Sequence, residues 1–224
     1  MDIKIYKYIF YIVIFSSIIF MLIKSTNLFN NKFYKNIKKI KNPENILVLV
    51  NKNNRLEKNY IPPDLENLSL KYATEEKYMR KEAKIAFERL SEEASLRNLI
   101  IIATSTYRSY EYQENLYQYY IDTKGEKYAD LCSARPGHSE HQTGLAVDVM
   151  GSNYDYDLFE QSKEFKWMTE NAHKYGFIMR YPKGKEMITG FKYEPWHYRY
   201  VGIKVATYIY QNNLTLEEYY KILK

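Results

Sequence analysis

Two of the four histidines in this 224-residue chain stand close to carboxylates, in a pattern suited to binding a metal. His141 lies in the segment SEHQTGLAVD, in which Asp148 follows seven residues later, and His197 closes the segment EPWH. Two imidazoles and one carboxylate form a three-ligand set that leaves one tetrahedral position open, as catalytic zinc sites do. His141, Asp148 and His197 are therefore candidate ligands of one zinc ion.

Glu194 is the carboxylate outside this set, three residues before His197. A base beside a water molecule whose pKa a metal lowers to about 7 is the minimum equipment for hydrolysing an amide. On a regular strand, residues 194 and 197 would face opposite ways. Pro195 cannot donate to a strand ladder, however, and predicts an irregular start at which both side chains could reach one site.

These residues also have a plainer interpretation, because a single histidine is more often a surface or satisfied core residue than a ligand. The spacing of His141, Asp148 and His197 does not by itself exclude this plainer interpretation. His138 and His173 are interpreted as structural or solvated residues. His173 falls late in an amphipathic helix, where positive charge is favourable. Cys132 is the single cysteine. An intramolecular disulfide is therefore impossible, and we interpret Cys132 as a small buried residue without a catalytic role.

The elements that must position these residues alternate irregularly between strands and helices. Strand-forming runs predict strands at 46–50, 99–104, 144–150, 177–182 and 196–202. Apolar spacing and capping residues predict helices from Glu75 to Ala94, from Tyr110 to Ile121 and from 160 to 175, and a last short helix behind a capping box of Thr215 and Glu218.

Residues 123–143 lack periodicity and contain Gly125, Pro136 and Gly137, which predicts a long ordered loop of the kind that is often functional. The irregular order of elements favours an α+β fold with an antiparallel sheet over a doubly wound α/β fold.

The N-terminal residues 1–24 are predicted to be a membrane anchor. Residues 9–23 carry no charge and are flanked by Lys7 and Lys24. Such a segment is short for a hydrocarbon core of roughly 30 Å, but flanking lysines can lengthen the effective span. A cleaved signal peptide is the alternative, although no small-residue cleavage site follows Ile23. A buried core helix is the third interpretation, disfavoured because a polar stalk follows.

The positive charge of the chain is concentrated in its N-terminal part. Residues 25–44 contain five lysines and one glutamate and are interpreted as a basic stalk. Residues 45–224, the expected catalytic domain, contain 25 basic and 25 acidic residues. A neutral domain has no net positive charge to offer phosphates, so nucleic-acid binding is not expected.

Several strings together resemble one family. SEHQTGLAVD has the form Ser-x-His-x-x-Gly-x-Ala-x-Asp and, with EPWH, closely resembles the VanY-type zinc D-alanyl-D-alanine carboxypeptidases of bacterial cell walls, including their L,D-carboxypeptidase relatives. The resemblance spans about residues 48–202 and extends to VLVNK, YIPPDL, STYRSYEYQ, SARPGHSEHQTG and GFIMRYP. It implies an α+β fold of the DD-carboxypeptidase/hedgehog-like type, a small antiparallel sheet packed with helices.

The resemblance also implies a role for each matching metal-site residue. It implies that His141, Asp148 and His197 hold one zinc ion per chain and that Glu194 is the catalytic base.

For the substrate, the resemblance implies that Arg108 stabilises the developing oxyanion or holds the substrate carboxylate. Gln113 and Ser133 match residues that help to bind the C-terminal end of the peptide in the L,D-type relatives, and Tyr181 is a weaker match of this kind. A planar guanidinium with amide and hydroxyl donors suits a terminal carboxylate.

The implied activity is removal of the C-terminal D-Ala from peptidoglycan stem peptides, by a domain outside the cell whose N-terminus is anchored in the membrane. The expected partners are stem peptides and the membrane, and no protein partner can be inferred. A D,D preference is favoured, with an L,D-carboxypeptidase acting on tetrapeptide stems as the alternative. A non-catalytic cell-wall binding module is a further alternative, against which the retained Glu194 argues.

Overall fold

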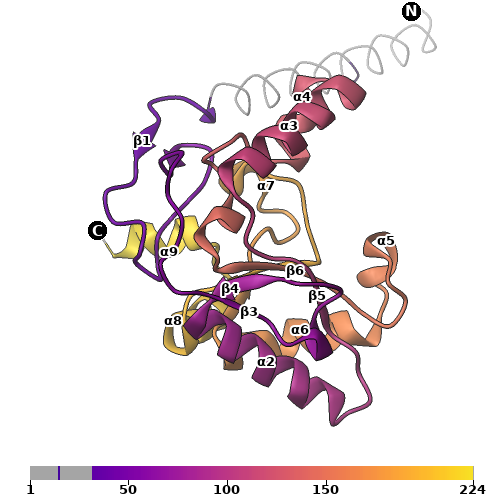
Figure 1. Ribbon diagram of the computed structural model, residues 1–224. Helices are drawn as coiled ribbons and strands as arrows, with labels where there is room; N and C mark the ends of the chain where they lie inside the picture. Colours follow the sequence, from indigo (N-terminus) through magenta and orange to yellow (C-terminus); the bar gives the residue numbers. More distant parts are fainter. Residues whose placement is uncertain (1–14, 16–31, 224) are drawn as a thin grey trace, which may run out of the picture. The chain divides into compact units, whose positions relative to one another are not determined.

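The computed structural model describes residue 15 and residues 32–223 of the chain (Figure 1). The expected anchor, residues 1–24, lies outside the described residues except for Phe15. Within the described part, no helix is both long and apolar enough to cross a membrane. The chain divides into two compact units, Met1–Asn36 and Ile37–Lys224, and the second contains every element described below.

The largest sheet has four antiparallel strands in the order β5-β6-β8-β7. Their bounds are Ile102–Ser105 (β5), Ala146–Met150 (β6), Phe177–Met179 (β7) and His197–Tyr200 (β8). Asp148 on β6 is the cross-strand partner of His197 on β8. Directly opposite residues of paired strands point to the same face, so the sheet itself brings these two side chains together.

The opposite face of this sheet belongs to the main hydrophobic core. Val147 and Val149 of β6 and Tyr198 and Tyr200 of β8 alternate with the residues of the first face and are buried in that core. Helix α2 (Lys81–Ser95) packs into the same core through apolar residues spaced three and four apart, namely Ala83, Phe87, Leu90 and Ala94. This two-sided alternation separates the apolar core from the polar face of the sheet.

Helices cover both faces of the sheet. Besides α2, the helices of the described residues are α3 (Tyr110–Lys124), α4 (Glu126–Cys132), α5 (Tyr156–Phe159), α6 (Lys163–Asn171), α7 (Glu186–Thr189), α8 (Ile203–Gln211) and α9 (Leu216–Ile222). In Figure 1, α2, α6 and α8 lie on one side of the sheet, and α3, α4 and α7 lie on the other. Short 3₁₀ helices are η1 (Leu70–Tyr72), η2 (Glu140–Thr143) and η3 (Ala172–Tyr175). The expectation of a small sheet packed with helices is confirmed.

Two smaller sheets complete the structure. Strand β1 (Lys38–Lys39) pairs in parallel with β2 (Asn54–Arg55). The second compact unit starts at Ile37, so β1 belongs to it although it lies in the segment 25–44 that was interpreted as a stalk. Strand β3 (Leu65–Asn67) pairs in antiparallel fashion with β4 (Tyr78–Arg80). Because 78–80 form this strand, the helix expected from Glu75 begins only at Lys81.

The elements expected at 46–50 and 123–143 also differ from the structure. Residues 46–50 form no strand, although Val48 and Val50 are buried. The carbonyl oxygens of Ile46 and Val48 instead accept hydrogen bonds from the Arg199 guanidinium, at 2.9 and 2.8 Å. The expected loop 123–143 contains α4 and η2, two short helices that periodicity does not reveal.

Candidate zinc centre and active site

The three candidate ligands meet on the polar face of the sheet. One ligand atom from each of His141, Asp148 and His197 lies within 4.8 Å of the other two, and all three residues are buried. Asp148 Oδ2 lies 3.3 Å from His141 Nε2, and Asp148 Oδ1 lies 2.7 Å from His197 Nδ1. The structure therefore brings together residues from two separate strings of the sequence.

His141 reaches the site from η2, which is joined to β6 through Gly144 and Leu145. Gly144 closes this turn in the left-handed region, with φ of +65°, and donates its N–H to the His141 carbonyl at 3.1 Å. A Cβ at Gly144 would lie 2.8 Å from Leu65 Cδ2 and 3.3 Å from the Arg80 backbone nitrogen. Glycine is required here both for the backbone conformation and for the close approach.

The His141 ring is oriented by the backbone that follows β5. His141 Nδ1 lies 2.6 Å from the Thr106 carbonyl oxygen, which can only accept a hydrogen bond, so the proton is on Nδ1. His141 Nε2 is buried, has no hydrogen-bond partner among the described residues and faces Asp148. An orphaned buried nitrogen beside a carboxylate and a second imidazole fits a zinc ligand.

The electrostatics of the cluster favour a bound cation. Burial and the nearby Arg108 lower the pKa of His141 to about 4, which keeps its ring neutral. Burial raises the pKa of Asp148, but the two histidines outweigh this effect and hold it well below its usual value. Burial lowers the pKa of His197, but Asp148 and Glu140 raise it to about 9. The negative potential that would hold a proton on His197 would equally attract a metal ion.

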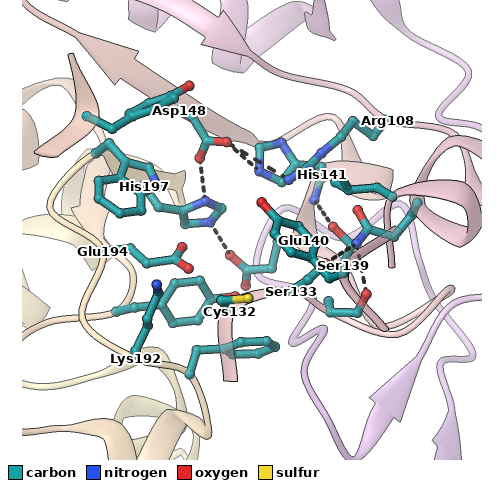
Figure 2. A pocket seen from close by; sticks show the side chains of 18 of the residues that line it. Arg108, Cys132, Ser133, Ser139, Glu140, His141, Asp148, Lys192, Glu194 and His197 are labelled. Carbon is teal, nitrogen blue, oxygen red and sulfur yellow. Dashed lines mark hydrogen bonds and ion pairs between the residues drawn. The ribbon is translucent and has the colours of Figure 1, made fainter. Parts of the chain in front are cut away.

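Glu194 lies in an irregular turn directly before β8, as Pro195 predicts. The His197 N–H donates to the Glu194 carbonyl at 3.2 Å, and β8 begins only at His197. Figure 2 shows the Glu194 carboxylate in the same cavity as the His197 ring. Burial raises the pKa of Glu194 to about 7, a value suited to a general base at neutral pH.

The residues matched to substrate binding line the same cavity of about 220 Å³. Arg108 Nη2 lies 3.9 Å from Asp148 Oδ2, and Arg108 Nε is buried without a partner among the described residues. Gln113 on α3 donates from Nε2 to Ser133 Oγ at 3.1 Å and to the Ala134 carbonyl at 2.8 Å.

Tyr181 is buried in the same cavity, and its ring stacks on the His197 ring at 4.9 Å between centroids. The cavity therefore combines the metal cluster, a carboxylate of raised pKa, a guanidinium and an amide–hydroxyl pair. Such a set can bind a peptide carboxylate and hydrolyse an amide.

A model of the family described as "VanY: D-alanyl-D-alanine carboxypeptidase" matches residues 76–203, more than half of the 224-residue chain. The chain belongs to the VanY family. The three candidate zinc ligands lie inside this range, as do Glu194 and Arg108.

Relatives and solved structures agree with this membership. YodJ of Bacillus subtilis (strain 168) is 44% identical over 207 residues, which are 87% of this chain and 76% of YodJ. The structure of LdcB, an LD-carboxypeptidase, has a TM-score of 0.78 and 45% identity, and the match covers 84% of this chain and 91% of that one. A mutant of the vancomycin resistance D,D-pentapeptidase VanY, solved with Zn(II), has a TM-score of 0.67 and 34% identity, with coverage of 77% and 97%.

As a VanY-family member, the chain is a metallo-carboxypeptidase with zinc as its cofactor. The donor set supports this, because two imidazoles and one carboxylate are ligands that zinc accepts. His138 and His173 lie outside the cluster: His138 Nδ1 contacts the Asn51 carbonyl at 2.8 Å, and the His173 ring stacks on Tyr210. Cys132, expected to be buried, is only partly buried and lines the cavity.

Sequence reasoning missed several residues of this VanY-family site. Glu140, adjacent to His141, is fully buried beside His197, and its place inside the SEHQTG string was the available signal. The role of the Thr106 carbonyl could not be predicted from the sequence, because any residue supplies a backbone oxygen. Tyr156 and Trp196 form one wall of the cavity with ring centroids 5.2 Å apart, and Lys192 also lines it.

Proposed function

We propose that the chain hydrolyses the bond before the C-terminal D-Ala of peptidoglycan stem peptides. The observation that carries this proposal is the convergence of three metal-binding side chains, Glu194 and Arg108 in one cavity. The family match and the two carboxypeptidase structures support the reaction class.

In this proposal, His141, Asp148 and His197 hold the zinc ion. When bound, zinc supplies a Lewis acid that polarises the scissile carbonyl and makes water a better nucleophile. Glu194, with its pKa raised to about 7, accepts the proton of the attacking water and then delivers it to the departing D-Ala amine. Tyr181 stacks on His197 and limits the movement of that ring.

Arg108, Gln113 and Ser133 are proposed to bind the terminal carboxylate of the peptide. Gln113 Oε1 has no hydrogen-bond partner among the described residues, and its Nε2 is already directed at Ser133. The Ser133 hydroxyl can therefore accept from Gln113 while donating to a carboxylate oxygen. Arg108 supplies the positive charge, either to this carboxylate or to the oxygen that becomes negative in the transition state.

The substrate proposal is tested with matched muropeptides. A D,D-carboxypeptidase releases D-Ala from the pentapeptide, whereas an L,D-carboxypeptidase releases it from the tetrapeptide, so both are assayed in parallel. We favour the D,D reaction. The L,D reaction is the second candidate because the LdcB structure is 45% identical over 84% of this chain.

Release of D-Ala from the tetrapeptide alone would overturn the D,D preference. A third arm uses the pentapeptide with an amidated C-terminus. We expect little cleavage, because the Arg108 guanidinium would lose its counter-charge. Efficient cleavage of the amide would contradict the role assigned to Arg108, Gln113 and Ser133.

We also propose that residues 1–24 anchor the protein in the cell membrane and that the catalytic domain lies outside the cell. The uncharged segment 9–23 and the extracellular location of peptidoglycan support this arrangement.

A further inference from the structure

Glu140 is a fully buried carboxylate next to the zinc-ligand candidates, and its two oxygens have different surroundings. Oε1 accepts hydrogen bonds from Arg180 Nε and from Arg199 Nη1, each at 2.7 Å. Oε2 has no hydrogen-bond partner among the described residues and lies 3.7 Å from His197 Nε2. His197 Nε2 is itself buried and without a hydrogen-bond partner in the described part of the chain.

His197 therefore lies between two carboxylates. Figure 2 shows Asp148 on one side of its ring and Glu140 on the other. Nδ1 faces Asp148 at 2.7 Å, and Nε2 faces Glu140. Since Asp148 belongs to the metal cluster, Nδ1 is the nitrogen on the metal side. Among the described residues, the carboxylate that faces Nε2 is Glu140, with Oε2 at 3.7 Å.

The two histidines thus use opposite nitrogens. His141 directs Nδ1 to the Thr106 carbonyl at 2.6 Å and keeps Nε2 for the metal side. A metal-binding imidazole carries its proton on the other ring nitrogen, and an acceptor there fixes the tautomer and the ring orientation. For His141 this acceptor is a backbone carbonyl. For His197 the candidate acceptor is a side chain, that of Glu140, which can be changed.

We propose that Glu140 is a positioning residue that accepts the Nε2–H of His197 and thereby holds Nδ1 toward the zinc. This inference rests on the zinc site of the proposed function and not on the choice of substrate. Arg180 and Arg199 are completely buried and hold the Glu140 carboxylate in place. A buried carboxylate needs such partners, because without them its desolvation is costly.

The same network supplies a matched control. Arg180 also donates from Nη1 and Nη2 to the two oxygens of Glu217 on α9, at 2.8 and 2.7 Å. Glu217→Gln weakens this buried network as Glu140→Gln does, but it leaves the carboxylate that faces His197 unchanged. The two variants therefore separate loss of stability from loss of ring positioning.

The test measures the zinc dissociation constant of the full-length chain by competition with a chromophoric chelator. In Glu140→Gln the amide oxygen is needed by the two arginines, which leaves NH₂ facing the Nε2–H of His197. We expect zinc binding to weaken about 10- to 100-fold, the range seen when such supporting acceptors are removed. Glu217→Gln should bind zinc within about twofold of the native affinity. Native affinity in Glu140→Gln, or equal weakening in both variants, would overturn the proposal.

A second measurement needs no variant and so does not depend on folding. In the zinc-loaded native chain, ¹⁵N imidazole NMR should show His197 protonated at Nε2 and His141 protonated at Nδ1. Protonation of His197 at Nδ1 would overturn the proposal. A native chain that binds zinc but cleaves neither muropeptide would contradict the proposed function while leaving this inference standing.

Discussion

Glu194 and Glu140 are both buried carboxylates beside His197, but their neighbours give them different properties. For Glu194, burial is the dominant effect and raises its pKa to about 7. For Glu140, burial also raises the pKa, but Arg180 and Arg199 outweigh it and lower the pKa well below the usual value. One carboxylate can therefore exchange a proton near neutral pH, while the other remains a fixed negative charge.

The role of Glu194 as the catalytic base can be tested by changing its carboxylate to an amide. Glu194→Gln keeps the shape of the side chain but removes the base, so D-Ala release should fall at least about 100-fold. Zinc content should not change, because Glu194 is outside the ligand set. Glu170→Gln, on the exposed side of α6, is the control and should retain full activity. Near-native turnover in Glu194→Gln would rule out the proposed mechanism.

At the scale of elements, the site depends on how β6 and β8 are paired and on the turn that leads into β6. Asp148 and His197 face each other only in the observed register, since a shift by one residue would move every side chain of a strand to the other face. Gly144 controls where His141 lies relative to this pair, because it ends η2 with φ of +65°.

Gly144→Ala should lower the free energy of unfolding more than Gly184→Ala does. Gly184 also has a positive φ, +80°, but a Cβ there would meet nothing within 4 Å. Gly184→Ala should therefore lose only about 1–2 kcal/mol of unfolding free energy, the usual cost of a left-handed non-glycine residue. Gly144→Ala should lose more, because its Cβ would also lie 2.8 Å from Leu65 Cδ2. Denaturant unfolding of both variants checks this, and equal losses would show that the close contact is relieved without cost.

At the scale of the whole molecule, the zinc cluster joins segments that are far apart in the sequence. His141 and Asp148 lie around the η2–β6 turn, and His197 begins β8, so the unfolded chain does not hold the three ligands together. A metal that binds only the folded chain stabilises it by mass action.

Removing the metal should therefore lower the melting temperature of the native chain. The fall should reverse when zinc is restored, and calorimetry with and without a chelator measures it. His197→Ala should bind much less zinc, and its melting temperature should respond little to the chelator. If that variant retained one zinc per chain, the ligand assignment would be wrong.

The anchoring proposal is also tested on the whole protein. We expect the full-length chain in the membrane fraction of cells and a variant without residues 1–24 in the soluble fraction, because the uncharged segment 9–23 favours hydrocarbon over water. Immunoblotting of both fractions measures this. A shortened full-length product released into the medium would instead support a cleaved signal peptide.

The predicted elements agree best with the structure where the sequence pattern that predicts them spans only a few residues. The capping box of Thr215 and Glu218 is present at α9, because both of its hydrogen bonds span three residues. Helix α3 begins at Tyr110 as expected, behind a Ser109 cap. Prediction was poorest at residues 46–50, since their partner is Arg199, about 150 residues away along the chain.

Ligand type, motif spacing and the effect of Pro195 are local properties, so the side chains that could bind zinc or act as a base were recognisable without a structure. The environment of those side chains, in contrast, depends on how the chain folds. Glu140 meets Arg180 and Arg199 across 40 and 59 residues, and burial is the largest of the effects that raise the pKa of Glu194. Desolvation and charge pairing depend on which distant segments pack together, and this is why the support of His197 by Glu140 became visible only in the folded chain.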